Sequence, residues 1–224
     1  MKPRVSNHKT GALTRVEVLV IISIVAVLIL IFLKKTESEV RAGRLYSANI
    51  TCINNLKQIG LAFRVWEGNH GDKFPMETSV TNGGTMELAN GENAWINFSV
   101  MSRELNTPKV LICPADAGKI AAANFTNGFD NGKISYFVGL NAVENYPQTL
   151  LSGDDNFAIG GVSIKTGLLE ISTNMPIDWT AARHRLNGRI LFSDGSVLNS
   201  YPNHDRLPDL ICQTGLATNR LAIP

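Results

Sequence analysis

The sequence predicts an α+β protein in which one long, hydrophobic N-terminal helix packs on a small globular domain with an antiparallel sheet. Two observations predict this fold. Residues 18–33 are apolar except for Ser23, and apolar residues at helical spacing continue well beyond them. The remaining chain holds short apolar runs separated by Asn-Gly and Asp-Gly pairs, which are typical of tight turns between strands. The length of 224 residues suffices for one domain with its own core.

The apolar block is long enough to cross a membrane. Sixteen to eighteen helical residues span roughly 24–27 Å, which is close to the thickness of a hydrocarbon core. A cleaved signal peptide is the alternative, but it needs small residues after the apolar run, and this chain continues with Lys34-Lys35-Thr36-Glu37. We therefore expect a retained, single-pass helix that spans a membrane over about residues 16–33. Basic residues flank it equally on both sides, so charge alone predicts no orientation.

The helix is predicted to continue to about Glu67. Asn69-His70-Gly71 then supplies a stop signal. We therefore assign the long helix to residues 13–71 and a turn-rich globular α+β domain to residues 72–224. The apolar stripe of the second part recurs at spacings of three, four and seven residues and comprises Leu45, Cys52, Leu56, Ile59, Phe63 and Trp66.

Within the globular domain the pattern predicts several short elements. Strands are expected at residues 109–113, 134–140, 162–171, 189–193 and 196–200. Helices are expected at residues 94–105 and 208–221.

The charge of the chain argues against nucleic acid as a partner. The formal net charge is only +2, and the basic residues are scattered among 19 acidic ones. Proteins that bind duplex DNA rely on clustered Lys and Arg. Residues 1–12 carry three basic and no acidic side chains, so the basic excess belongs to this leader.

Three cysteines permit at most one internal disulfide. The sequence holds no Cys-x-x-Cys, so it gives no support to a thioredoxin-like or zinc-ribbon site. Cys52 lies on the inner stripe of the long helix, and Cys113 ends a predicted strand. A bridge between them would join helix to sheet in an oxidising compartment. Three buried thiols without a bridge are an equally good interpretation.

The run Ala12-Leu13-Thr14-Arg15-Val16-Glu17, with its basic leader and apolar helix, resembles the prepilin-type cleavage and methylation segment. Type IV pilins and type II secretion pseudopilins share this segment. The resemblance implies cleavage between Ala12 and Leu13, methylation of Leu13, and a role for Glu17, fifth in the mature chain, in assembly. The usual pattern has Gly before the cut and Phe after it, where this chain has Ala12 and Leu13.

Further stretches resemble one branch of these proteins. They are residues 52–63 with Phe74-Pro75, the run Cys113-Pro114-Ala115-Asp116, residues 150–154, and a C-terminal His-x9-Asp-Gly signature at His184, Asp194 and Gly195. The resemblance implies a single-pass protein of the bacterial inner membrane with its globular domain on the periplasmic or extracellular side.

The resemblance implies a structural subunit of a type II secretion or type IV pilus-like filament. Its partners would be prepilin peptidase, the membrane and other pilin-like subunits, and it would polymerise through its N-terminal helix. The alternative is a membrane-tethered surface or binding protein that keeps the pilin-type leader but does not polymerise.

No motif predicts an enzyme. If the Asn187-Gly188 and Asp194-Gly195 pairs are tight turns, His184 lies at a strand edge and Asp194 at the far end of that hairpin, too distant for proton transfer. No cofactor is expected apart from a calcium ion, for which Asp154, Asp155 and Asn156 offer oxygen ligands. Their spacing fits no defined calcium loop, so a solvated turn is the simpler interpretation.

Overall fold

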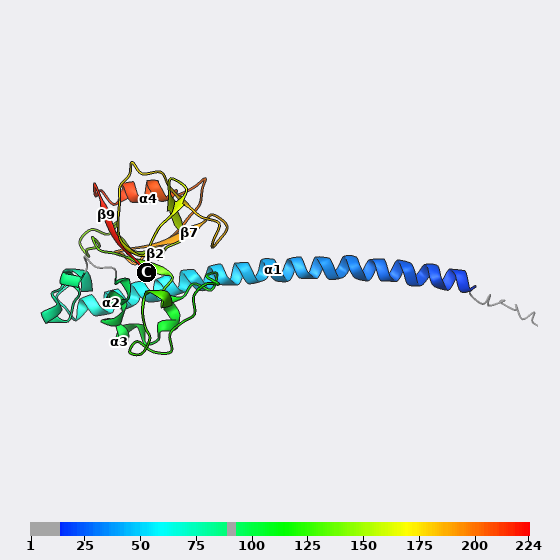
Figure 1. Ribbon diagram of the computed structural model, residues 1–224, viewed down its shortest axis with the longest axis horizontal. Helices are drawn as coiled ribbons and strands as arrows, with labels where there is room; N and C mark the ends of the chain where they lie inside the picture. The colour runs from blue at the N-terminus through cyan, green and yellow to red at the C-terminus, as the bar shows by residue number, and fades with distance from the viewer. Residues whose placement is uncertain (1–13, 89–92) are drawn as a thin grey trace, which may run out of the picture. The chain divides into compact units, whose positions relative to one another are not determined.

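The computed structural model describes residues 14–88 and 93–224 of the chain. Ala12 and Leu13, the predicted cleavage site, lie outside the described residues. The chain divides into two compact units, one that ends at Arg44 and one that comprises Leu45–Pro224. The long helix α1 (Arg15–Gly68) begins in the first unit and ends in the second (Figure 1).

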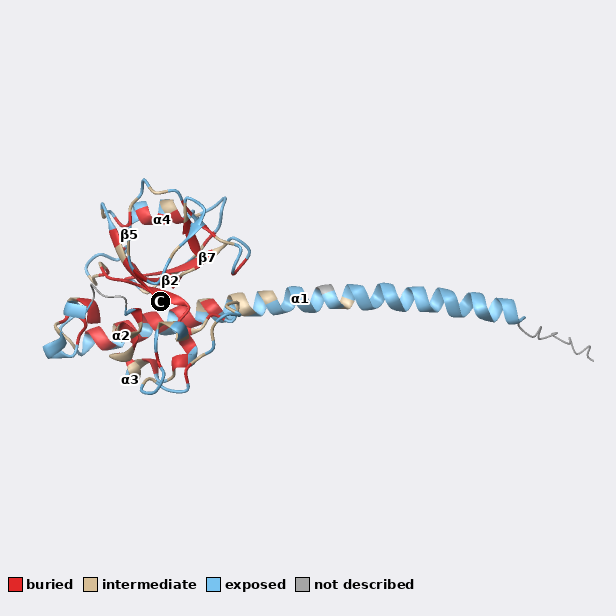
Figure 2. Ribbon diagram, viewed as in Figure 1, coloured by how far each residue is buried: buried red, intermediate tan, exposed pale blue. Residues whose placement is uncertain are grey.

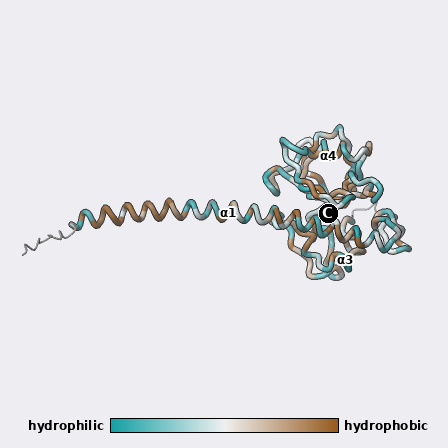
Figure 3. Tube along the Cα trace, turned by 180° about the vertical axis from the view of Figure 1, so that it is seen from behind, coloured by the Kyte–Doolittle hydropathy of each residue, from teal (hydrophilic) through white to brown (hydrophobic). Residues whose placement is uncertain are grey.

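The first part of α1 presents apolar side chains on every side. The large hydrophobic residues from Val16 to Leu33 are 41–69% exposed, and this stretch is both exposed in Figure 2 and strongly hydrophobic in Figure 3. A helix that is apolar all round is stable only when lipid or protein covers it. Within the described residues, α1 is the one helix long and apolar enough to cross a membrane.

The second part of α1 buries one face in the globular unit. Five members of the predicted stripe are at most 2% exposed: Cys52, Leu56, Ile59, Phe63 and Trp66. Between them, outward-facing residues such as Leu61 and Val65 stay exposed. The helix ends at Gly68, one residue before the predicted stop signal. The predicted end of the helix near Glu67 and the inner face from Cys52 to Trp66 are therefore confirmed, whereas Leu45, the first member of the predicted stripe, is only half-buried.

Two antiparallel sheets form the globular unit. The larger has the order β5-β9-β1-β2-β7-β8, and the smaller has the order β4-β3-β6. The strands are β1 (Tyr136–Gly139), β2 (Leu150–Asp154), β3 (Phe157–Ile159), β4 (Val162–Ser163), β5 (Gly167–Ile171), β6 (Ile177–Trp179), β7 (Gly188–Phe192), β8 (Val197–Ser200) and β9 (Asn219–Ile223).

Short helices and 3-10 turns complete the globular unit. They are α2 (Ala94–Ser99), α3 (Ser102–Leu105), α4 (Leu207–Gln213) and the 3-10 turns η1 (Pro75–Glu77), η2 (Val80–Asn82), η3 (Met86–Leu88), η4 (Pro108–Leu111) and η5 (Asn131–Lys133). In Figure 1 the larger sheet separates α4 from α2 and α3.

The central strands β1, β2 and β7 of the larger sheet are buried on both faces, and the described residues of the unit form two hydrophobic cores. Along β7, Leu191 contributes to the core shared with α1, while Ile190 and Phe192 contribute to the core shared with α4. Leu151 and Leu150 on β2 divide in the same way. This alternation follows from the pleat of a strand, which turns successive side chains to opposite faces.

Several predicted elements differ from the structure. The predicted strand at 109–113 is wrong: Pro108 and the Thr107 side chain, which accepts a hydrogen bond from the Lys109 backbone N–H, begin the 3-10 turn η4 instead. The predicted helix at 208–221 ends at Gln213, because Gly215 adopts a positive φ of 68°. The predicted helix at 94–105 is broken into α2 and α3, and the strand at 162–171 into β4 and β5.

Candidate functional site

Glu17 forms a capping box with Thr14 at the start of α1. The Thr14 backbone N–H and hydroxyl donate to Glu17 Oε2 at 2.7 and 2.9 Å, and the Glu17 backbone N–H donates to the Thr14 hydroxyl at 3.3 Å. Reciprocal bonds of this kind satisfy the free N–H groups of the first turn. Glu17 therefore has a local role in the single chain, in addition to any role in assembly.

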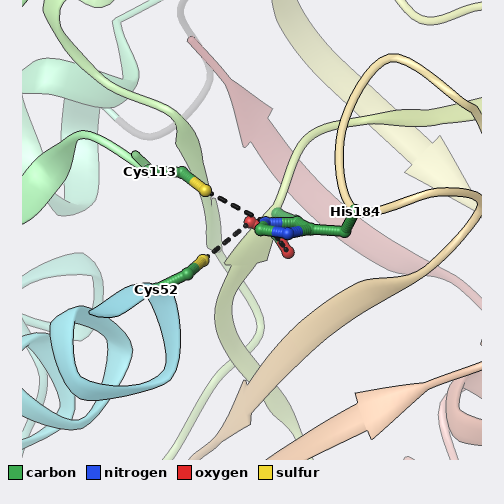
Figure 4. Close-up of side chains that lie close together, drawn as sticks. Cys52, Cys113 and His184 are labelled. Carbon is green, nitrogen blue, oxygen red and sulfur yellow. Dashed lines mark hydrogen bonds and ion pairs between the residues drawn. The ribbon is translucent and has the colours of Figure 1, made fainter. Parts of the chain in front are cut away.

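A second candidate site lies between α1 and the larger sheet. Cys52, Cys113, Asp154 and His184 are all buried, and one ligand atom from each lies within 4.8 Å of every other. We call these four residues the thiol–histidine cluster. Cys52 comes from α1, Cys113 follows η4, Asp154 ends β2 and His184 precedes β7. Figure 4 shows both sulfur atoms pointing toward the His184 ring.

The separations within this cluster are short. Cys113 Sγ lies 3.0 Å from His184 Nε2, and Cys52 Sγ donates to Asp154 Oδ1 at 3.4 Å. His184 Nε2 lies 3.7 Å from Asp154 Oδ2. The side chains of His184 and Asp154 are 1% and 0% exposed. Groups this polar are costly to bury unless each has a partner or a metal.

A second layer of residues fixes the imidazole tautomer. Asn49 Oδ1 accepts a 2.8 Å hydrogen bond from Arg189 Nη2 and lies 2.8 Å from His184 Nδ1. Since an amide oxygen cannot donate, Nδ1 must carry the proton that it shares with Asn49. In a neutral ring, Nε2 then keeps its lone pair, and that lone pair faces the two thiols and the carboxylate.

Arg189 also balances the buried carboxylate. Its backbone N–H donates to Asp154 Oδ2 at 3.0 Å, and its Nη1 lies 3.5 Å from the same oxygen. The hydroxyl of Tyr136 donates to Cys52 Sγ at 3.3 Å from the β1 side. Each of these groups therefore has a neighbour that orients it.

The two thiols differ in acidity. Burial raises the pKa of Cys52 strongly, and the nearby Asp154 charge acts in the same direction. The contacts with Cys52 and with His184 lower the pKa of Cys113 to about 6, although burial opposes this. The Cys52 thiol keeps its proton and donates it to Asp154 Oδ1. Cys113 is thus the thiol that ionises first.

The turn that carries His184 has an unusual backbone. His184, Arg185 and Leu186 have φ values of 52°, 54° and 66°, a left-handed conformation that costs L-residues roughly 1–2 kcal/mol each. Asn156 helps to hold this turn, since its Nδ2 lies 3.3 Å from each of three backbone oxygens on residues 180, 183 and 187. The prediction that His184 lies at a strand edge is therefore wrong: it is placed in a strained turn and buried in the cluster.

The remaining signature residues do not approach His184. Asp194 is exposed in the turn between β7 and β8, where its Oδ1 accepts a 2.7 Å bond from the Ser196 backbone N–H. Gly195 follows with a φ of 84°, which favours glycine. The interpretation of the Asp-Gly pair as a hairpin turn is confirmed.

The predicted disulfide between Cys52 and Cys113 is not formed in the structure. Both residues, and the exposed Cys212, are free thiols. The structure nevertheless brings the two sulfur atoms together, within 4.8 Å of each other.

The three residues considered for calcium face different partners. Asp154 belongs to the cluster, Asp155 forms ion pairs with Lys119 and Arg183, and Asn156 faces backbone carbonyls. No shared oxygen site results from these three residues. The calcium interpretation therefore gains no support from their placement.

The thiol–histidine cluster has two chemical uses in principle. A thiol, an imidazole and an amide in line are the groups of a cysteine nucleophile, but such a nucleophile must reach a substrate, and Cys113 is 0% exposed. Two sulfurs, a nitrogen and an oxygen around one point are also ligands for a metal ion. The sequence marks all four residues, though for other reasons.

We compared the chain with protein-family models, curated proteins and solved structures, and none of the three comparisons found a match.

Proposed function

We propose that this protein is a membrane-anchored, pilin-like structural subunit that polymerises through the first part of α1 after prepilin peptidase removes the leader. The observation that carries the proposal is the division of one continuous helix into an apolar part that is exposed on all sides and a part with one buried face. The first part needs a partner, which lipid supplies before assembly and neighbouring helices supply afterwards. The resemblance of residues 12–17 adds the processing step.

The move from lipid to filament requires more than hydrophobicity. Lipid tails are as apolar as the side chains of residues 18–33, so helix association depends on close packing and on polar pairs. Glu17 supplies such a pair if it meets the methylated amine of Leu13 in a neighbouring subunit. A carboxylate at membrane depth without a partner costs of order 2.5–3.5 kcal/mol on insertion scales. The proposed pair removes this cost only in the assembled state.

The proposal also includes the location. In proteins with this leader, the globular domain lies outside the bacterial inner membrane. The subunit would serve a type II secretion or type IV pilus-like machine, with other pilin-like chains as partners and no catalytic activity of its own.

One observation favours the alternative of a tethered protein that does not polymerise. The capping box gives Glu17 a purpose inside a single chain, so the acid alone does not require a neighbour. The two functions share the membrane helix and differ in self-association.

Mass spectrometry of the native N-terminus tests the processing step. In cells with active prepilin peptidase, we expect a mature chain that begins at methylated Leu13. The same cells without the peptidase serve as the control and should yield the unprocessed chain. An intact Met1–Ala12 leader in peptidase-positive cells would refute processing and favour the tethered alternative.

A further inference from the structure

We propose that the thiol–histidine cluster is a structural zinc site, in which Cys52, Cys113, Asp154 and His184 bind one Zn²⁺ ion. The first argument is the donor set. Zinc binds thiolate, imidazole nitrogen and carboxylate oxygen, and four protein ligands make a closed, structural site. Calcium and magnesium prefer oxygen ligands throughout, so two sulfurs exclude them as occupants.

The second argument is geometry. In a tetrahedral zinc site with ordinary bond lengths, neighbouring ligand atoms lie roughly 3.3–3.8 Å apart. The separations here are 3.0 Å for Cys113 Sγ to His184 Nε2, 3.4 Å for Cys52 Sγ to Asp154 Oδ1, and 3.7 Å for His184 Nε2 to Asp154 Oδ2. The largest separation in the set is at most 4.8 Å. Only small side-chain shifts are needed to surround an ion.

The third argument is the second layer. Metal-binding histidines commonly donate their other N–H to an oxygen, which fixes the tautomer and the ring orientation. Asn49 Oδ1 does this for His184, and Arg189 holds Asn49 in turn. Arg189 also donates its backbone N–H to Asp154. The arrangement orients two of the four proposed ligands before the ion arrives.

The fourth argument is charge. Without metal the net charge of the site is zero, because the Arg189 guanidinium balances the Asp154 carboxylate and both thiols are neutral. The net charge is the same if the Cys113 proton moves to His184. When Zn²⁺ binds, both thiol protons go to solvent. The net charge is again zero, because the ion and the guanidinium together balance the two thiolates and the carboxylate. A buried site with no net charge in either state avoids the high cost of an uncompensated buried charge. Binding is then expected to release two protons per ion.

A disulfide between Cys52 and Cys113 is the competing fate of the same two sulfurs. It would remove the thiol that donates to the buried Asp154 and leave the His184 lone pair without a partner. Zinc uses all four groups, whereas the bridge uses two. The ion would join four segments that are far apart in sequence: α1, the residues after η4, the end of β2 and the turn before β7.

The proposal is tested on the full chain in detergent micelles, purified with a reductant and then loaded with Zn²⁺ or Co²⁺. We expect one zinc ion per chain, and with Co²⁺ a thiolate-to-metal charge-transfer band together with the visible bands of a tetrahedral site. Loading should raise Tm by about 5–10 °C at saturating metal, and a chelator should reverse the rise. Reduced wild-type protein that binds neither metal would overturn the proposal.

Variants locate the ion. Cys113→Ser and Asp154→Asn should each lose the cobalt charge-transfer band or weaken zinc binding at least about tenfold, while the matched control Cys212→Ser should bind like the wild type. If a cluster variant fails to fold, the wild-type metal content and the Cys212→Ser spectrum still decide the question. Loss of the band in Cys212→Ser, or a Cys52–Cys113 disulfide in protein taken from cells, would overturn the proposal in favour of another site or of the bridge.

Discussion

Glu17→Gln separates the two roles that the structure and the resemblance give to this acid. In the capping box, Glu17 Oε2 accepts hydrogen bonds of 2.7 and 2.9 Å from Thr14. A glutamine carbonyl can accept the same bonds, and glutamine is a regular member of such boxes. The substitution therefore keeps the helix start and removes only the charge. Glu17→Ala removes both, at a further cost of about 1 kcal/mol of helix stability.

The expected effect on assembly is large. If Glu17 pairs with the Leu13 amine of a neighbour in a low-dielectric filament core, the loss of one partner costs roughly 3–5 kcal/mol. At about 1.4 kcal/mol per factor of ten, subunit association weakens by about two to four orders of magnitude. Membrane insertion is expected to survive, since a neutral amide enters lipid more easily than a carboxylate.

Crosslinking in cells with active prepilin peptidase measures this effect. We expect Glu17→Gln and Glu17→Ala to sediment with membranes and to lose self-crosslinks. Glu37→Gln is the matched control, because Glu37 is an exposed acid further along α1 and its loss changes the net charge equally. Wild-type levels of crosslinking in Glu17→Gln would refute the pairing mechanism and leave the capping box as the full account of Glu17.

Three further predictions concern the globular unit. Gly188→Ala should lower the stability measured by thermal unfolding by about 1–3 kcal/mol, because the added Cβ would lie 2.3 Å from the Trp179 ring. The control Gly118→Ala should change the stability little, because its Cβ meets only an ordinary contact at 3.6 Å. Burial lowers the pKa of Lys119 from 10.5 to about 8, so the unfolded chain holds this proton more tightly than the folded chain. The free energy of unfolding should therefore rise by up to about 3 kcal/mol as the pH increases from about 8 to about 10.5. Unfolding curves of Lys119→Met should lack that rise. Asn156→Ala should speed hydrogen exchange in residues 180–187, while an unchanged exchange rate would show that other contacts hold this turn.

Elements were predictable from the sequence where apolar residues recur at a clear spacing, as in α1, or where turn signals lie beside an apolar run, as in β1 and β7. The stripe from Cys52 to Trp66 has the spacing of a helix with one buried face, and the structure confirms it. Strand β2 has the sequence Leu-Leu-Ser-Gly-Asp and is buried on both faces, so it shows no alternation of apolar and polar residues. Strand β9 lies where the sequence analysis predicts the end of the helix at 208–221. The sequence does carry a signal that the helix ends earlier, namely Gly215 with its positive φ.

The cluster could not be assembled from sequence, even though each of its four residues carries a sequence signal. Cys52 and Cys113 suggest a disulfide, Asp154 suggests calcium, and His184 is part of a pattern that resembles a family signature. Their convergence depends on β2, which has no strand signal, and on a left-handed turn at His184 built from residues other than glycine. Non-glycine residues rarely adopt that conformation, so no local rule predicts it.

Helix α1 is continuous, but its first and second parts place different constraints on the sequence. While they face lipid, residues 18–33 need only stay apolar, so Val, Ile and Leu are largely interchangeable there. Residues 52–66 must fit a close-packed core, where a change of one methylene is felt. The two stretches can therefore diverge at different rates. The first stays apolar while its individual residues change freely, whereas each position of the second is constrained by its neighbours in the core. An exchange of the first stretch between related chains, with the join near Arg44, is expected to leave the core of the second unit unchanged.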